Sequence, residues 1–218
     1  MPASLSRDAA SARPIGAEPS AWVQRWSHLV AAGATVLDVA CGSGRHVRYF
    51  AARGCRVTGV DRDADTLRPL EGIAELHVAD IESGAWPFHD RRFDAVVVTN
   101  YLWRERLADV VACVAPGGVL LYETFSAGHE RIGKPSNPKF LLQHGELLKA
   151  TLPLRPIAFE EGFEEGSREG FQAAGPRFVQ RIVAWCVDAG AADGRRCLLA
   201  RAPAPAAKVN SRDSEDSA

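Results

Sequence analysis

Two acidic residues on successive apolar runs, with a glycine-rich turn between them, are the residues best suited to chemistry. Asp38 lies near the end of the run 36–39, the turn 40–44 comes next, and Asp61 ends a second run at 57–60. Such a turn presents bare backbone N–H groups to a ligand, and a carboxylate on the next strand can accept hydrogen bonds from a ribose diol. The pattern therefore predicts a site for a nucleoside-containing cofactor.

The segments around this turn alternate between strand-like and helix-like patterns. The run 95–98 is too apolar for a half-exposed strand and indicates a parallel strand covered on both faces. The alternation predicts an α/β fold with a doubly wound, mostly parallel sheet. Strands are predicted at 35–39, 56–60, 75–79, 93–99 and 119–122, and helices at 20–30, 45–53, 64–70 and 103–114.

The pattern changes after Phe125. Residues 126–140 are loop-like, residues 140–150 look helical, and residues 115–118 are expected to form a turn. Strand-like segments at 177–187 and 196–201 are so close that they must pair antiparallel, and they complete a seven-stranded sheet. We expect the acidic run 160–165 to be a solvated loop, and one domain at 19–202 between disordered tails at 1–18 and 203–218.

The composition and charge of the chain limit the partners and the cellular location that we expect. The formal net charge of −1 over 218 residues gives no reason to expect nucleic acid or an anionic membrane as a partner. No apolar run approaches the roughly 20 residues that span a bilayer, and the first residues do not read as a signal peptide. Five cysteines without CxxC spacing suggest neither disulfides nor a metal site. We expect a cytoplasmic protein that is a monomer or a weak dimer.

The residues directly after the turn bear on the identity of the cofactor. A dinucleotide site of the G-x-G-x-x-G type needs a third glycine, but Gly44 is followed by Arg45, His46 and Val47. This argues against a nicotinamide-dependent dehydrogenase.

At this point the chain resembles the class I S-adenosylmethionine-dependent methyltransferases. Residues 37–44 resemble their first motif, with Ala40 in place of its first glycine, and Asp61 matches the acidic residue that ends the second strand. The resemblance covers roughly residues 20–202, and the segment 123–148 is similar to small bacterial methyltransferases of the tellurite-resistance type. Further matches are Ala79-Asp80-Ile81 after the third strand, residues 93–98 in the fourth, and Ala115-Pro116-Gly117-Gly118 before the fifth.

The resemblance implies S-adenosylmethionine as cofactor, S-adenosylhomocysteine as product, no metal, and a Rossmann-like methyltransferase fold. Asp38 would bind the ammonium of the methionine part, although it could instead cap the next helix. Asp61 would bind the ribose, Asp80 would face the adenine amino group, and Ile81 would pack on the base. The cofactor-binding residues expected are Asp38, Ala40, Cys41, Gly42, Gly44, Asp61, Arg62, Asp80, Ile81 and Asn100.

The acceptor is expected to be a small molecule that docks near Tyr101, Glu123 and His129. Methyl transfer from a sulfonium is an in-line displacement with an activated leaving group, so the protein mainly aligns the reactants and excludes water. No residue stands out as a general base, which favours a soft or anionic nucleophile. A pseudoenzyme or sensor that only binds the cofactor stays open. The near-neutral charge disfavours a nucleic-acid methyltransferase.

Overall fold

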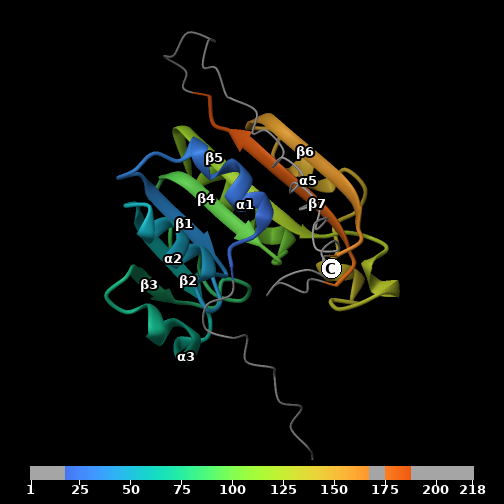
Figure 1. The fold of residues 1–218 in the computed structure, drawn as a ribbon, viewed down its shortest axis with the longest axis horizontal. Helices are drawn as coiled ribbons and strands as arrows, with labels where there is room; N and C mark the ends of the chain where they lie inside the picture. Colours follow the sequence, from blue (N-terminus) through green and yellow to red (C-terminus); the bar gives the residue numbers. More distant parts are fainter. Residues whose placement is uncertain (1–17, 167–174, 188–218) are drawn as a thin grey trace, which may run out of the picture.

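Parallel strands form most of the sheet, and an antiparallel pair closes it (Figure 1). The computed structural model describes residues 18–166 and 175–187. Within them the strands have the order β3-β2-β1-β4-β5-β7-β6. They are β1 (Thr35–Val39), β2 (Arg56–Asp61), β3 (Glu75–Val78), β4 (Phe93–Thr99), β5 (Val114–Phe125), β6 (Arg155–Glu164) and β7 (Arg177–Trp185).

Strands β1 to β5 pair in parallel, and β7 is antiparallel to both β5 and β6. This confirms the predicted fold class. Because β1 pairs with β2 on one side and with β4 on the other, the strand order reverses between β1 and β4. Ligands of open α/β sheets bind at the carboxyl ends of the strands beside such a reversal.

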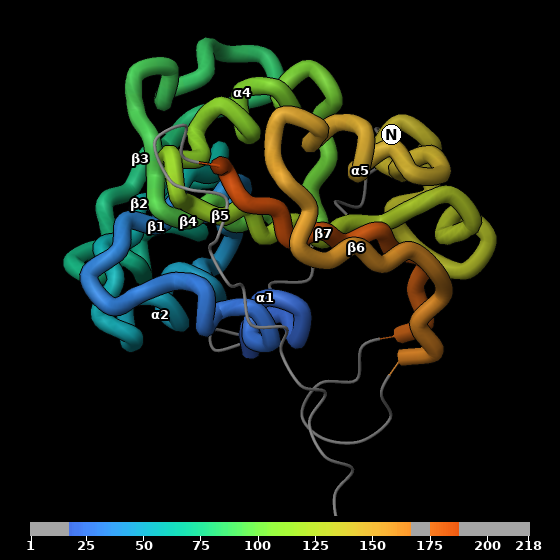
Figure 2. Tube along the Cα trace, turned by 90° about the horizontal axis from the view of Figure 1, so that it is seen from above, coloured from blue at the N-terminus to red at the C-terminus, as the bar shows by residue number. Residues whose placement is uncertain are grey.

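The helices cover both faces of the sheet. Figure 2 shows α1 and α2 on one side and α4 and α5 on the other. Ser20 caps α1, because its side chain accepts from the backbone N–H groups of Trp22 and Val23. The α-helices are α1 (Ala21–Trp26), α2 (Arg45–Ala52), α3 (Ala64–Leu67), α4 (Leu107–Ala112) and α5 (Glu146–Ala150), and the 3-10 helices are η1 (Ser27–Leu29), η2 (Arg68–Leu70), η3 (Arg104–Arg106), η4 (His129–Arg131) and η5 (Pro138–Phe140).

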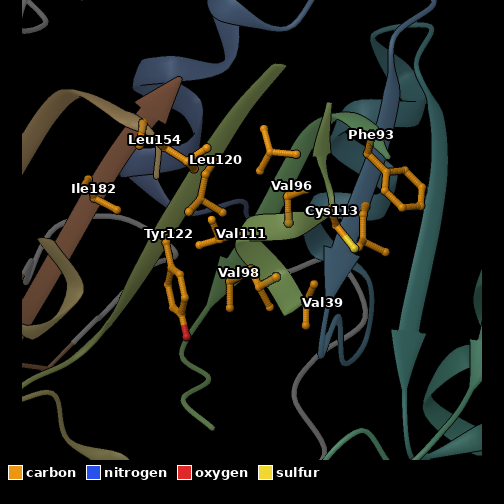
Figure 3. Packing of buried hydrophobic residues seen from close by; sticks show 14 of the residues in the cluster. Val39, Phe93, Val96, Val98, Val111, Cys113, Leu120, Tyr122, Leu154 and Ile182 are labelled. Atoms are coloured by element: carbon orange, nitrogen blue, oxygen red, sulfur yellow. The ribbon is translucent and has the colours of Figure 1, made fainter. Parts of the chain in front are cut away.

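The central strand β4 is buried on both faces, as its composition predicts. Val96 and Val98 belong to the core under α4 and α5, whereas Ala95 and Val97 belong to the core under α1 and α2. All four side chains have 0% exposure. Figure 3 shows Val96 and Val98 among the side chains of the first core, which includes Leu120, Tyr122 and Ile182 from β5 and β7.

Three predictions for the second half of the chain were wrong. The acidic run 160–165 belongs largely to β6, an edge strand whose carboxylates pair with arginines of β7. Residues 115–118 lie inside β5, because Gly117 donates to the carbonyl of Cys186 at 2.8 Å and extends the pairing of that edge. The helix expected at 140–150 is confined to Glu146–Ala150.

Of the predicted hairpin segments 177–187 and 196–201, the first contains β7, which forms an antiparallel pair with β6. The second of those two segments lies outside the described residues, as do both expected tails apart from residue 18. Residues 126–140, expected to be loop-like, contain two short 3-10 helices, η4 and η5.

Candidate functional site

The turn between β1 and α2 has a backbone that favours small residues. Ala40, Gly42 and Gly44 have φ angles of 52°, 51° and 75°. A Cβ atom at Gly44 would overlap the side chain of Leu70, so glycine is required there for space as well as for conformation. The alanine at position 40, where the related motif has glycine, adopts the left-handed conformation that the turn requires.

Asp61, at the end of β2, stabilises this turn through hydrogen bonds of its carboxylate. Its carboxylate accepts from the backbone N–H of Gly42 at 2.9 Å through Oδ2 and from that of Asp63 at 3.1 Å through Oδ1. A carboxylate has about four lone-pair sites, so capacity remains for a further donor.

A cavity of about 250 Å³ lies beside Asp61. Its wall includes five of the predicted cofactor residues, together with Tyr101, which was predicted to contact the acceptor. Ala79 and Glu82 also contribute, and their position on either side of Asp80-Ile81 was the signal that could have identified them. The lining residues are Ala40, Asp61, Arg62, Ala79, Asp80, Ile81, Glu82 and Tyr101. The predicted residues Asp38, Cys41, Gly42, Gly44 and Asn100 are not part of this lining.

Asp80 organises the turn 80–84 that forms one side of the cavity. Its carboxylate accepts from the backbone N–H groups of Glu82 at 2.9 Å and Ser83 at 3.3 Å, and from the Ser83 hydroxyl at 2.7 Å. These bonds, the one from the Ser83 hydroxyl above all, lower the pKa of Asp80. The next residue, Ile81, is 5% exposed and offers an apolar surface to the cavity.

Asp38 is a buried carboxylate on the face of the sheet under α1 and α2. Burial raises its pKa to about 7, against an opposing effect of the Arg45 guanidinium. Its Oδ2 atom has no hydrogen-bond partner among the described residues. A buried carboxylate oxygen in this state is costly unless a ligand or water donates to it.

His46 stands between Asp38 and the start of α1. Its Nδ1 lies 4.0 Å from Asp38 Oδ1, and its Nε2 accepts from the backbone N–H of Ser20 at 3.1 Å. Burial lowers the pKa of His46 to about 3, so the ring is neutral. The hydrogen bond that Nε2 accepts places the ring proton on Nδ1, on the side of Asp38.

Asn100 and Tyr101 come directly after β4, next to the carboxyl end of β1. Asn100 adopts a φ angle of 55°, and its N–H donates to the carbonyl of Glu123 at 2.9 Å. Asn100 Oδ1 and the Tyr101 hydroxyl are buried, and neither has a partner within residues 18–166 and 175–187. Burial raises the pKa of Tyr101, so its hydroxyl stays protonated. Together with Asp38, they leave three unsatisfied polar atoms on or after neighbouring strands.

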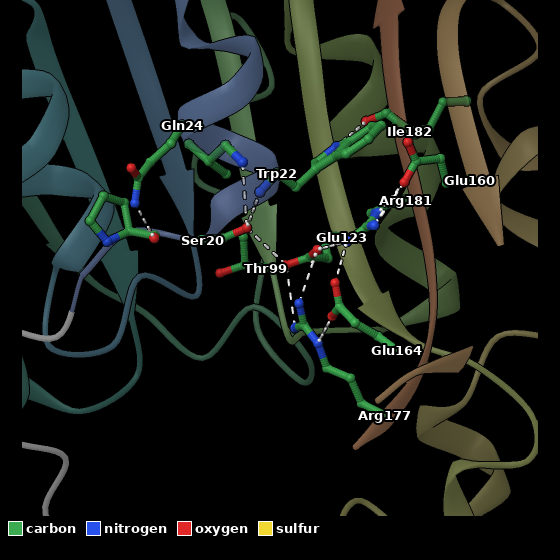
Figure 4. A network of polar contacts seen from close by, with 12 residues as sticks. Ser20, Trp22, Gln24, Thr99, Glu123, Glu160, Glu164, Arg177, Arg181 and Ile182 are labelled. Atoms are coloured by element: carbon green, nitrogen blue, oxygen red, sulfur yellow. Dashed lines mark hydrogen bonds and ion pairs between the residues drawn. The ribbon is translucent and has the colours of Figure 1, made fainter. Parts of the chain in front are cut away.

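Glu123 lies in a network of charged side chains near the end of β5 (Figure 4). It is fully buried and accepts from the Ser20 hydroxyl at 2.9 Å. Arg177 and Arg181 of β7 bind it at 3.4 Å and 3.3 Å, and each also pairs with Glu164 of β6. A direct contact of Glu123 with an acceptor stays a prediction, because its carboxylate already has these three donors.

His129 is also buried, at 4% exposure, and its ring stacks on Phe125 with centroids 4.4 Å apart. Its Nε2 lies 3.0 Å from the carbonyl of Lys134, so Nε2 carries the proton. Its Nδ1 has no partner among the described residues, and the ring is not part of the cavity wall.

The described residues contain neither a metal-binding group nor a membrane-spanning helix. No three His, Cys, Asp or Glu side chains within them are grouped as a metal ion requires. None of the described helices is long and apolar enough to cross a membrane.

Comparison with known proteins bears on the same region. A family described as a methyltransferase domain matches residues 36–118. The chain is 35% identical over 104 residues to a malonyl-[acyl-carrier protein] O-methyltransferase of Salmonella typhimurium, which is 44% of this chain and 40% of that protein. It is 30% identical over 122 residues to a ubiquinone biosynthesis O-methyltransferase of Paraburkholderia phytofirmans, 48% of this chain and 49% of that protein. The match thus spans less than half the length of either curated relative.

Solved structures share the fold over a larger part of the chain. TehB from Haemophilus influenzae aligns with a TM-score of 0.58 at 18% identity, over 75% of this chain and 60% of that one. A SAM-dependent methyltransferase from Methanosarcina mazei aligns with a TM-score of 0.59 at 19% identity, over 79% of this chain and 100% of that one. At such identities the likeness shows the fold.

Proposed function

We propose that this chain, whose fold and matched domain are those of the class I S-adenosylmethionine-dependent methyltransferases, transfers a methyl group from S-adenosylmethionine to a small-molecule acceptor. The observation that carries the proposal is the pair of buried oxygens on Asp38 and Asn100 that find no hydrogen-bond partner among the residues the structure describes. Both accept hydrogen bonds, and they lie on or just after the neighbouring strands β1 and β4. An α-ammonium group supplies the donors that such oxygens lack.

The other residues of the site suit the adenosine half of the cofactor. Asp61 faces the cavity with a carboxylate, which fits the two hydroxyls of a ribose. Ile81 offers an apolar surface for a base, with Asp80 beside it. The unsatisfied atoms and the cavity together fit a ligand with a cationic end and a nucleoside end. A nicotinamide dinucleotide has no ammonium group for Asp38.

When bound, S-adenosylmethionine supplies an activated methyl group on a sulfonium. The chain's own residues then bind and orient the reactants and exclude water. We propose a soft or already anionic acceptor, because such a nucleophile arrives without a proton that a base must remove. An acceptor with a hydroxyl needs a base, and the candidate is His129, whose Nδ1 has no partner among the described residues while its Nε2 donates to the Lys134 carbonyl.

Calorimetry with S-adenosylmethionine, S-adenosylhomocysteine and NAD tests the binding step. We expect both adenosyl ligands to bind and NAD not to bind. Tight binding of NAD without binding of S-adenosylhomocysteine would overturn the proposal.

Release of S-adenosylhomocysteine then tests turnover. Small thiols, chalcogen oxyanions, amines and carboxylates are the acceptors to screen, and hydroxyl compounds join them because two curated relatives are named O-methyltransferases. Release with at least one of these classes supports an enzyme. Binding without release over the whole screen would favour a cofactor sensor instead.

A further inference from the structure

The turn 80–84, which forms one side of the cavity, is held from outside by an arginine of another segment. Arg106 of η3 donates from Nε to the carbonyl of Ile81 at 2.7 Å and from Nη2 to the carbonyl of Gly84 at 2.6 Å. Its third bond, from Nη1 to Asp109 at 2.9 Å, belongs to its own helical segment. One guanidinium therefore bridges two carbonyls of the turn.

These bonds complement those that the turn makes within itself. Asp80 accepts from the N–H groups of Glu82 and Ser83, and its own carbonyl accepts from the N–H of Gly84 at 2.9 Å. The donors of the turn thus point back to Asp80, and two of its carbonyls point out to Arg106. Charge-assisted hydrogen bonds from a planar guanidinium fix orientation as well as distance.

Arg106 also belongs to the segment that forms another part of the cavity wall. Tyr101 lines the cavity, and its carbonyl is held by the Tyr122 hydroxyl of β5 at 2.9 Å. The short stretch from Tyr101 to Arg106 therefore connects this side of the cavity to the turn 80–84. Movement of the turn away from Tyr101 must stretch or break the two carbonyl bonds.

We infer that Arg106 is a positioning residue that fixes the turn 80–84 against the segment after β4, and so sets the affinity for the adenosine half of the cofactor. The inference rests on the proposed function. Arg106 itself is absent from the cavity wall and acts through Ile81 and Gly84. A substitution of Arg106 should therefore change the affinity by the same factor for every ligand that carries the adenosine half of the cofactor.

The test measures dissociation constants of S-adenosylhomocysteine and 5′-methylthioadenosine, which lacks the amino-acid part. We expect Arg106→Lys to weaken both ligands by the same factor, on the order of tenfold, because a lysine cannot bridge both carbonyls. Asp38→Asn should weaken S-adenosylhomocysteine alone. An Arg106→Lys protein that is folded and binds both ligands like wild type overturns the inference, and so does a loss confined to S-adenosylhomocysteine.

The same helical segment supplies a matched control. Arg104 also binds two carbonyls, those of Lys139 and Leu141, and one carboxylate, Glu146. None of these partners lines the cavity. Arg104→Lys should leave both dissociation constants within about twofold. Asp109→Asn should do the same, because it removes only the charge of the carboxylate that Arg106 binds within its own helical segment. If Arg104→Lys and Arg106→Lys lose the same affinity for the two ligands, the loss reflects a general destabilisation of the segment, and the inference is overturned.

A second measurement covers the case in which Arg106→Lys does not fold. In the wild-type protein, 5′-methylthioadenosine should slow hydrogen exchange in residues 80–84 and also in residues 104–106. Protection confined to residues 80–84 overturns the coupling. If the wild type binds neither ligand, the proposed function fails first, and that outcome is distinct from normal binding with no effect of Arg106.

Discussion

Asp38→Asn should stabilise the ligand-free protein at neutral and alkaline pH. Asp38 is 1% exposed and lacks a partner for Oδ2 among the described residues, so its ionised form is costly in the folded state. Asparagine has nearly the same shape and carries no charge. The substitution should therefore remove the cost of a buried carboxylate that only a cationic ligand offsets.

The magnitude can be worked out from the pKa. Burial, the main cause, raises the pKa of Asp38 from 3.8 to about 7, the Arg45 guanidinium opposes that rise, and the neighbouring Asp61 carboxylate adds to it. Each pKa unit corresponds to about 1.4 kcal/mol, so ionisation in the folded state costs about 4 kcal/mol at high pH. This is an upper bound for the gain, because the asparagine amide also needs hydrogen-bond partners.

The sign of the pH dependence is fixed by proton binding. Between pH 4 and 7 the folded state holds a proton on Asp38 that the unfolded state has lost, so the contribution of Asp38 to wild-type stability falls as pH rises. Above pH 7 this contribution is constant. His46 acts in the opposite direction, because burial lowers its folded-state pKa from 6.5 to about 3 while the unfolded state still binds its proton up to about pH 6.5. This contribution is common to wild type and Asp38→Asn, so it cancels in the difference between them.

Urea unfolding of ligand-free protein from pH 4 to 9 is the assay. The free energy of unfolding of Asp38→Asn minus that of wild type should increase from pH 4 to 7 and then level off. Asp65→Asn, whose side chain is 80% exposed, is the control and should show no such increase. A difference between Asp38→Asn and wild type that is the same at pH 5 and pH 8 would refute the reasoning.

Two further predictions concern the ligand. Asp61→Ala should weaken S-adenosylhomocysteine about 5- to 150-fold, corresponding to roughly 1–3 kcal/mol, because the ribose contact and the brace on Gly42 are both lost. The control is Asp63→Ala, which removes only the cap of α3. If folded Asp61→Ala binds S-adenosylhomocysteine with an unchanged dissociation constant, Asp61 does not contact the ribose. S-adenosylhomocysteine should also bind more tightly as pH rises towards 7, by up to about tenfold per pH unit, because its ammonium needs an ionised Asp38. Calorimetry from pH 5.5 to 8 measures this, and a flat profile there contradicts the assignment.

The parallel part of the fold was predictable from sequence because its signals are local. β1 and β4 have the predicted bounds, since both are mostly apolar and are buried on both faces over most of their length. β6 was missed because it is an edge strand with three glutamates in ten residues. Its backbone pairs with β7 along its length, and Arg177 and Arg181 of β7 pair with two of its glutamates, but neither interaction is local in sequence.

The candidate site likewise has some features that the sequence predicts and others that it does not. Asp61, Asp80 and Ile81 lie at or just after strand ends, so their convergence on the cavity could be read from the motif order. The bond from Arg106 to Ile81 spans 25 positions, and nothing in the sequence around either residue indicates it. The hydrogen bond from the Ser20 N–H to His46, the neighbour of Asp38, likewise comes from outside the motif.

The position of α1 has a consequence for biosynthesis. Its cap residue Ser20 donates to Glu123, 103 positions away, and the indole of Trp22 donates to the carbonyl of Ile182, 160 positions away. Although α1 is translated before every strand of the sheet, it cannot complete these contacts until β7 has been translated. Because such distant contacts close late, the apolar face with Trp22 and Trp26 is not fully covered before β7 is translated. A nascent chain halted before residue 182 should therefore expose the two tryptophans that the finished protein buries.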